Sequence, residues 1–186
     1  MSKNDKTESK KRKGKAVKTF SKLTKEAASS RLCDVADLPG FVRQKAAMIS
    51  AHLLLPEGAR IVDMGCETGE ISFLLAHLNP RAEVTGIDID PAAIDFARRT
   101  YQLPNLSFRQ SSAAMADFDD DSVDAIINSN MLHSVYSFAG YNTDDVHQLL
   151  ESQNRKLKTG GTMLIRDYIM PPENEFVLLE LPDVPS

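Results

Sequence analysis

Tryptophan is absent from the 186 residues, cysteine occurs only twice, and no apolar run is long. The longest apolar stretch, residues 51–55, is far shorter than the roughly 20 residues that a membrane-spanning helix needs. The amino-terminal residues also lack the apolar segment of a secretory signal. Cys33 and Cys66 lie in unrelated contexts, which argues against a disulfide framework or a cysteine-based metal site. These absences predict a soluble protein of a reducing, cytoplasmic compartment, with no membrane span and no metal.

Charge is divided unevenly along the chain. Residues 1–25 hold ten lysines and arginines against two acids, a net charge of +8. The other residues hold 12 basic and 24 acidic side chains, a net charge of −12. A block of like charge without apolar periodicity is typical of a disordered arm. Such an arm is either a tether to nucleic acid or an acidic membrane, or a solvated tail.

Alternating apolar patterns predict helices and strands in turn. An apolar spacing of three to four residues predicts an amphipathic helix over residues 41–55, between Pro39-Gly40 and Pro56. Asp90 as an N-cap, followed by Pro91, marks the start of a later helix. Strands are expected at residues 60–64, 83–87, 106–109, 123–128 and 162–166, and further helices at residues 70–78, 91–100 and 144–157.

This alternation is typical of βαβ units. It predicts an α/β fold with a doubly wound, mostly parallel, Rossmann-like sheet. We expect four segments: a basic arm at residues 1–25, a helical segment at 26–58, a cofactor-binding core at 59–170 and an extension at 171–186. Ligands of such sheets bind outside the carboxyl ends of the strands, which places the site before any motif is considered.

A glycine-containing loop follows the first expected strand. Its sequence, Gly65-Cys66-Glu67-Thr68-Gly69, runs directly into a helix. Glycine lets the backbone approach a ligand closely, and the start of a helix favours an anionic group. The second strand ends at Asp88, about 20 residues farther on, where a carboxylate is placed to accept both hydroxyls of a ribose. Glu67 and Glu70 stand where a dinucleotide fingerprint needs glycines, which disfavours a pyrophosphate.

Five stretches of the chain carry a family resemblance. They are residues 61–69, 84–91, 122–127, 130–133 and 157–162. In this order they resemble the motifs of the class I S-adenosylmethionine-dependent methyltransferases. The first resembles the glycine motif, the second ends in the ribose-binding acid, and the fourth resembles the Leu-His stretch after strand four. The resemblance covers residues 41–170 and implies the fold and the cofactor, S-adenosylmethionine.

The resemblance also implies roles for single residues. Asp63 would orient the loop and the amino group of the methionine moiety, and Gly65 and Gly69 would approach that moiety. Asp88 would hold the ribose, Ser112 and Ala113 would lie beside the adenine, and Asn128 would lie near the methionine end. The implied cofactor-binding set is Asp63, Gly65, Cys66, Gly69, Asp88, Ile89, Ser112, Ala113 and Asn128.

Two residues of the chain depart from the family pattern. Glu67 replaces the middle glycine of the loop, and Ser112 replaces an acid that accepts a hydrogen bond from the adenine amino group. A neutral acceptor makes a bond weaker by roughly 1 kcal/mol. These departures keep open the hypothesis of a non-catalytic, methyltransferase-like interaction module.

The acceptor of the methyl group is predicted only as a class. Residues 128–131 lack the Asn-Pro-Pro-Tyr of enzymes that methylate the amines of bases, and the Leu-His stretch resembles small-molecule members. A small-molecule acceptor is therefore favoured, and an RNA or protein acceptor recruited by the basic arm is the alternative. If the acceptor needs a base, the candidates are His133, Asp167 and Tyr168, at the ends of strands four and five.

The end of the chain is short for this family. After the fifth expected strand, residues 171–186 suffice for one short element, so we expect the sheet to lack the usual last β-hairpin. An open sheet edge favours association. An oligomer, or a longer parent chain, is the expected way to cover it.

Overall fold

The computed structural model describes residues 33–168, in which five strands form one sheet. The strand order is β3-β2-β1-β4-β5, and every pairing is parallel. The chain starts at the central strand and winds first to one side and then to the other, so the predicted doubly wound α/β sheet is confirmed. The strands are β1 Arg60–Met64, β2 Glu83–Asp88, β3 Leu106–Gln110, β4 Val123–Ser129 and β5 Leu157–Arg166.

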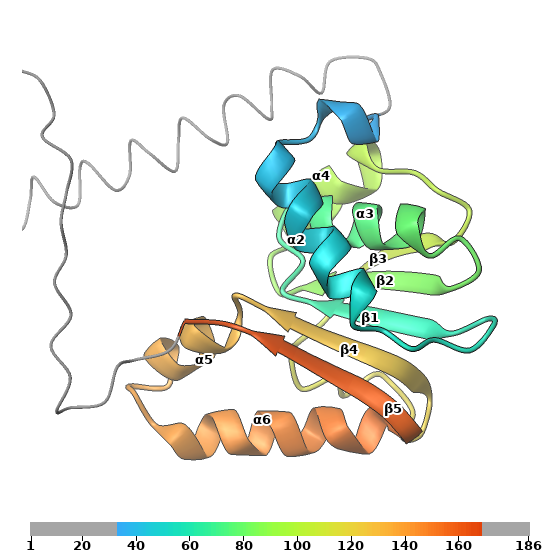
Figure 1. Ribbon diagram of the computed structural model, residues 1–186. Coiled ribbons are helices and arrows are strands. Elements are labelled where there is room, and N and C mark those ends of the chain that lie inside the picture. The colour runs from blue at the N-terminus through green and yellow to red at the C-terminus, as the bar shows by residue number, and fades with distance from the viewer. Residues whose placement is uncertain (1–32, 169–186) are drawn as a thin grey trace, which may run out of the picture.

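Helices cover both faces of the sheet (Figure 1). One face carries α2 Gly40–Ala51, α3 Glu70–Leu78 and α4 Pro91–Thr100, preceded by a short 3-10 turn, η1 Val35–Asp37. The opposite face carries α5 Leu132–Phe138 and α6 Thr143–Lys156. As predicted, the Asp90 side chain caps α4 by accepting from the N–H of Ala92 at 2.8 Å. None of the helices between residues 33 and 168 is long and apolar enough to cross a bilayer.

Successive residues of β1 point into different cores, because side chains alternate across a strand. Ile61 packs with Ile49 of α2 and Leu75 of α3, whereas Val62 packs with Leu149 of α6. The alternation continues to the carboxyl end of the strand, where it turns Asp63 toward the α3 face. Asp63 near the end of β1 is therefore positioned by the same two-residue alternation of side chains that buries the apolar residues before it.

Two element boundaries differ from the sequence prediction by more than one residue. Helix α2 ends at Ala51, and Leu53 is buried from a turn in which its N–H reaches the Ser50 carbonyl at 3.1 Å. Strand β5 begins at Leu157, before the two glycines. Its register to β4 is irregular, since Val123 pairs with Leu157 and Ala125 pairs with Thr162. The Gly160-Gly161 stretch is thus a bulge inside the strand and not a turn ahead of it.

The basic arm at residues 1–25 and the extension at 171–186 lie outside the described residues, as does the end of the predicted 59–170 core. Predictions about a tether and a missing hairpin therefore stay predictions. Within residues 33–168, β5 is hydrogen-bonded to β4 alone.

Candidate functional site

The loop after β1 is held by glycines whose backbone no other residue would adopt easily. Gly65 has a φ of +63° and Gly69 a φ of +94°. A Cβ on Gly65 would lie 2.8 Å from the Met131 side chain, and one on Gly69 would lie 2.8 Å from the Phe108 ring. The resemblance implied that these glycines make room for the cofactor. The structure adds a second reason, because neighbouring side chains already fill the space where each Cβ would lie.

Asp88 ties the end of β2 to this loop. One oxygen of its carboxylate accepts from the N–H of Glu67 and the other from the N–H of Asp90, both at 2.9 Å. The Cys66 N–H donates to the Ile87 carbonyl at 2.9 Å and strengthens the same junction. Asp88 and the glycine loop are therefore in direct contact, as binding of one cofactor by both would require.

Asp63 is a buried carboxylate beneath the loop. It is 2% exposed and accepts from the Ser72 hydroxyl at 2.6 Å. Its pKa is raised to about 6, mainly by burial and also by the nearby Glu67 and Asp88, although the Ser72 bond and Lys45 act to lower it. A buried carboxylate with one strong donor still has lone pairs for a cationic ligand group, such as an ammonium.

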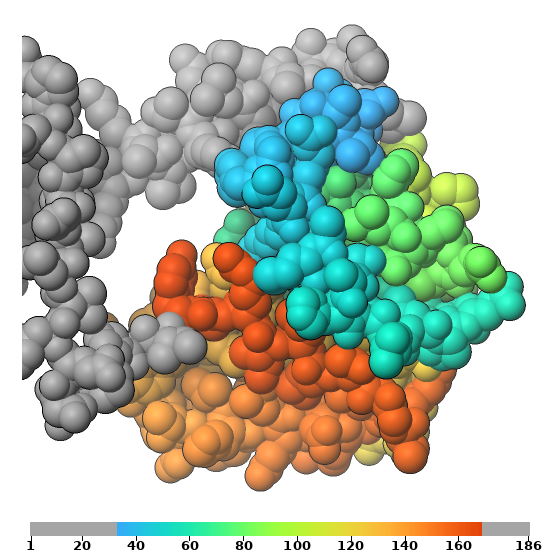
Figure 2. Space-filling view, viewed as in Figure 1, coloured from blue at the N-terminus to red at the C-terminus, as the bar shows by residue number. Residues whose placement is uncertain are grey.

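Lys45 is a site residue that the sequence did not single out. It lies on α2, and its ammonium is attracted by Asp63, Glu67 and Asp167. Loss of solvent lowers its pKa most, followed by repulsion from Arg166. Figure 2 shows the α2 segment adjoining the end of β5 on the surface, as these charge interactions require. The apolar periodicity that predicted the helix carries no signal for a single, partly buried lysine on it.

Glu67 occupies the position where the family has glycine. It adopts a positive φ of +48°, a conformation that favours glycine. Loss of solvent raises the pKa of its carboxylate most, followed by repulsion from Glu70 and Asp88. Lys45 and His133 act in the opposite direction. Glu67 therefore places an additional carboxylate near the carboxyl edge of the sheet, while the loop keeps a backbone conformation that favours glycine.

Ile89 of the implied cofactor-binding set lies in the loop that follows β2, and Ser112 and Ala113, which are expected beside the adenine, lie in the loop that follows β3. Ile89 is 75% exposed, and Ser112 is exposed, with its carbonyl accepting from the Met115 N–H at 3.0 Å. The N–H of Ser111 donates to the Asp88 carbonyl at 3.0 Å. Ser112 and Ala113 thus follow a residue bonded to Asp88, on the ribose side of the expected site.

Asn128 lies at the same edge but is paired inside the protein. Its amide donates to the Gln153 side chain at 2.7 Å and accepts from it at 3.2 Å. Gln153 also donates to the Ala113 carbonyl at 3.1 Å. Asn128 is fully buried, and its amide faces α6 instead of the glycine loop. The side chain that the resemblance placed near the methionine end therefore has a structural partner.

Ser129 is a second residue that sequence reasoning missed. Its hydroxyl is buried and has no hydrogen-bond partner within the described part of the chain. By strand alternation it shares the face of Asp63, because Asp63 is level with Ile127 and Ser129 lies two residues farther on. An orphaned hydroxyl in this place fits a polar ligand that would complete its bonding.

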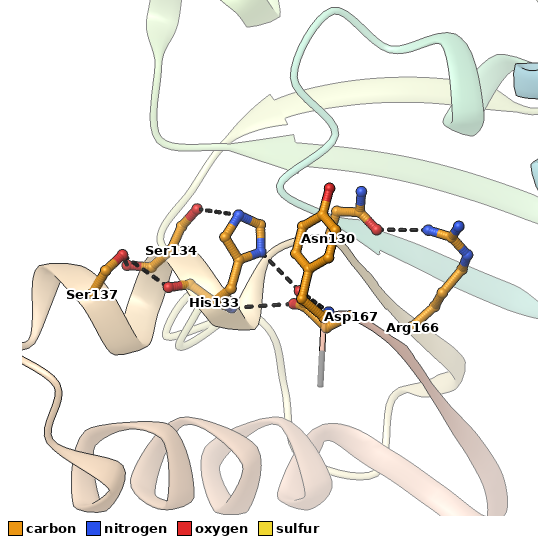
Figure 3. Close-up of polar contacts among 7 residues, drawn as sticks. Asn130, His133, Ser134, Ser137, Arg166 and Asp167 are labelled. Atoms are coloured by element: carbon orange, nitrogen blue, oxygen red, sulfur yellow. Dashed lines mark hydrogen bonds and ion pairs between the residues drawn. The ribbon is translucent and has the colours of Figure 1, made fainter. Parts of the chain in front are cut away.

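The three candidate bases, His133, Asp167 and Tyr168, come together beyond β4 and β5. Figure 3 shows His133 beside Asp167. His133 Nδ1 lies 2.8 Å from one oxygen of Asp167, and the His133 N–H donates to the other oxygen at 3.1 Å. The rings of His133 and Tyr168 meet edge to face, with centroids 5.1 Å apart. Beside them, Arg166 donates to the Asn130 side chain at 2.6 Å. The three candidate bases therefore form one cluster of contacting side chains.

The acidic run before β4 is used in surface pairs. Asp117 accepts from the Ser111 hydroxyl at 2.6 Å and pairs with Arg109 at 3.2 Å. Asp120 pairs with Lys156 at 2.6 Å, a contact that lowers the pKa of the Asp120 carboxyl. Across residues 33–168, no three histidine, cysteine or acidic side chains are grouped as ligands for a metal ion.

Fold and site together define a class: Rossmann-like proteins that bind a nucleotide-type cofactor with a glycine loop after β1 and an acid at the end of β2. A comparison with protein families narrows this class. The family described as "Methyltransferase domain" matches residues 55–181, more than half of the chain. The chain belongs to this methyltransferase family, and the resemblance to class I S-adenosylmethionine-dependent methyltransferases is confirmed.

Named relatives agree with this family. The chain is 32% identical over 119 residues to the phthiotriol/phenolphthiotriol dimycocerosates methyltransferase of Mycobacterium leprae, covering 63% of this chain and 40% of that protein. It is 31% identical over 111 residues to the fatty-acid O-methyltransferase of Mycolicibacterium smegmatis, covering 60% and 38%. The chain therefore spans about two fifths of the length of these relatives.

A solved structure shows the same fold. Geranyl diphosphate methyltransferase in complex with S-adenosylmethionine aligns with a TM-score of 0.52 and 23% identity. The alignment covers 65% of this chain and 47% of that protein. The structural match supports a common fold. Because the identity is low, the site has to be argued from this chain's own residues.

Proposed function

We propose that this chain binds S-adenosylmethionine and transfers its methyl group to a small-molecule acceptor. The observation that carries the proposal is the Asp88 carboxylate, which contacts the glycine loop through the Glu67 N–H at 2.9 Å. Asp88 is thereby fixed at the point where the ribose of an adenosine is held in this class of sheet.

The other residues fit the same cofactor. Buried Asp63 suits the ammonium of the methionine moiety, and Lys45 is a cation near enough to it to suit the carboxylate. The orphaned Ser129 hydroxyl offers a further bond. Acids at positions 67 and 70 repel a pyrophosphate, so the site favours this cofactor over a dinucleotide. A small-molecule acceptor is supported by two relatives, which are named for phthiotriol/phenolphthiotriol dimycocerosates and for a fatty acid.

The protein's contribution to catalysis would be alignment. When bound, the cofactor supplies a methyl group on a positively charged sulfur, so the hard chemistry resides in the cofactor. Asp63, Asp88 and Lys45 would fix its two ends, and the loop would hold it at the carboxyl edge of the sheet. The acceptor would enter beside His133 and Asp167, and the chain would contribute by holding acceptor and cofactor together.

Calorimetry with S-adenosylmethionine and with NAD tests this proposal. We expect the wild-type chain to bind the first and not the second. Asp88→Asn should weaken binding by about 10- to 100-fold, because a charge-assisted bond contributes about 1.5–3 kcal/mol. Asp95→Asn, a matched exposed acid on α4, should bind as wild type does. Thermal unfolding of each variant would separate lost affinity from lost folding.

Four outcomes would contradict or redirect the proposal. Binding of NAD, or wild-type affinity in a folded Asp88→Asn variant, would overturn it. Binding of neither cofactor would favour the non-catalytic interaction module. If S-adenosylmethionine binds, RNA binding that falls steeply with salt and vanishes on deletion of residues 1–25 would favour the alternative acceptor.

A further inference from the structure

We infer that His133 is the general base of this site, with Asp167 as its positioning residue, and that the acceptor carries a hydroxyl group. The inference rests on the proposed methyl transfer and deepens it. It names the acceptor as an alcohol or phenol, whose oxygen must lose a proton when it is methylated.

Asp167 sets the tautomer of the histidine ring. Partial burial acts to raise the pKa of Asp167, but the N–H groups of Tyr168 and His133 and the His133 ring together hold it below its ordinary value. An ionised carboxylate only accepts hydrogen bonds. The contact of 2.8 Å between Asp167 and His133 Nδ1 therefore requires the proton on Nδ1. In the neutral ring this leaves Nε2 as a free acceptor.

The orientation of the ring is fixed by more than one bond. Asp167 accepts from both the backbone N–H and the ring of His133, so one carboxylate holds the backbone and the side chain of this residue. The Tyr168 N–H holds that carboxylate at 2.8 Å, and the Tyr168 ring lies against the histidine edge to face. Figure 3 shows the His133 ring between Ser134 and Asp167. A carboxylate that orients a histidine through Nδ1 is an arrangement that suits a histidine general base.

The His133 ring is partly exposed, so a substrate can reach it. The His133 side chain is 42% exposed, whereas that of Asp167 is 10% exposed. Ser134 Oγ is 3.3 Å from Nε2, a long contact for a hydroxyl, so an acceptor hydroxyl can replace it. Glu67 of the glycine loop is close enough for its carboxylate to sense the histidine charge. The charged or titratable groups facing His133 are thus Glu67, Asp167 and Tyr168.

These features match a hydroxyl acceptor and not a carboxylic acid. A carboxylic acid is already ionised at neutral pH and needs no base. For a hydroxyl, the O–H proton moves to Nε2 while the oxygen lone pair forms a bond to the methyl carbon. The electron pair of the carbon–sulfur bond goes to sulfur, which leaves as a neutral thioether. The imidazolium that results is stabilised by the Asp167 carboxylate, and bulk solvent then takes the proton.

Nuclear magnetic resonance of ¹⁵N-histidine tests the geometry without turnover. In wild-type protein at a pH where the ring is neutral, the His133 signals should report a proton on Nδ1. Asp167→Asn should shift the ring toward a mixture of tautomers, while Asp145→Asn, an exposed acid on α6, should not. A proton found on Nε2 in the wild type would overturn the inference.

Transfer of labelled methyl groups tests the acceptor class. The probes are two matched pairs, 1-naphthol with 1-naphthoic acid and 1-dodecanol with dodecanoic acid. We expect methylation of the hydroxyl members, reduced about 10²- to 10⁴-fold in His133→Gln. The acidic limb of the wild-type pH profile should disappear in that variant, and Asp167→Asn should move the limb to lower pH because the imidazolium loses its anionic partner. His147→Gln, an exposed histidine on α6, should match wild type.

The outcomes separate this inference from the function on which it rests. Failure of S-adenosylmethionine to bind overturns the proposed function itself. If it binds, the dyad alone is overturned by a His133→Gln rate within threefold of wild type. Methylation of the acids only, or of none of the four probes, overturns the hydroxyl acceptor.

Discussion

Single residues at the carboxyl edge serve the fold and the expected ligand together. Gly69 shows this most directly, because its φ of +94° starts α3 and its missing Cβ leaves room for the Phe108 ring. Gly65 does the same for Met131. A change at either position therefore disturbs the protein before any cofactor is considered.

Gly69→Ala should destabilise the protein more than Gly160→Ala. Both glycines have a positive φ, so both variants lose about 1–2 kcal/mol to left-handed backbone strain. Only at Gly69 does the new methyl group meet Phe108 and Ala97, at 2.8 and 2.9 Å, which adds about 1–3 kcal/mol of overpacking. Urea unfolding measures the difference, and equal losses in the two variants would show that the contact is relieved without cost.

The site was only partly predictable at this scale. Motif spacing located Asp63, the glycines and Asp88, because these residues lie where strands must end. Lys45 and Ser129 were missed, since a lysine on a helix and a serine after a strand are common and have no spacing signature. The geometry around His133 was also beyond the sequence, because residues 133 and 167 meet only after β4 and β5 have paired.

At the scale of elements, one buried amide pair joins β4 to α6. Asn128 and Gln153 satisfy each other at 2.7 and 3.2 Å, and Gln153 also binds the Ala113 carbonyl. Buried amides in mutual contact have little to gain from other partners. The pair therefore fixes the position of α6 along the sheet in a way that apolar contacts alone would not.

Gln153→Leu should lower the free energy of unfolding by about 1–3 kcal/mol, because it leaves buried polar groups of Asn128 and Ala113 without partners. The double variant with Asn128→Leu should lose less than the sum of the two single losses. A double-mutant cycle in urea measures this coupling. Gln148→Leu, on the exposed side of α6, is the control, and strict additivity would exclude the proposed pairing.

The elements themselves were largely predictable from sequence. The bounds of β1, α3 and α4 agree with expectation because apolar period, caps and glycines all change at the same residues. The end of α2 was placed too late because Leu53 continues the helical period from a turn. The bulge in β5 was missed because two adjacent glycines ordinarily indicate a turn. Helix α5 was not assigned, since its seven residues are too few for a clear apolar period.

At the scale of the whole molecule, a carboxylate buried near the centre of the sheet links stability to pH. Asp63 has its pKa raised from 3.8 to about 6 by burial. The folded state therefore holds this proton more tightly than the unfolded chain does. As pH rises through the window between these values, the contribution of this group to stability falls by about 3 kcal/mol, at about 1.4 kcal/mol per unit.

Asp63→Asn should remove this window, because the amide keeps an oxygen for Ser72 and has no charge to bury. Relative to Asp63→Asn, the wild-type chain should lose about 2–2.5 kcal/mol of unfolding free energy between pH 4 and pH 7. Urea titrations across this range, with Asp145→Asn as the surface control, measure the effect. Parallel curves for wild type and Asp63→Asn would show that Asp63 is ionised throughout.

The two backbone bonds to Asp88 have a kinetic consequence. Since the N–H groups of Glu67 and Asp90 already hold the carboxylate, the loop does not have to be recruited when an adenosine arrives. A preorganised receptor loses little conformational entropy on association. Capture of the cofactor would then be limited by diffusion to the carboxyl edge of the sheet, and discrimination among adenosine compounds would appear mainly in the residence time of each one.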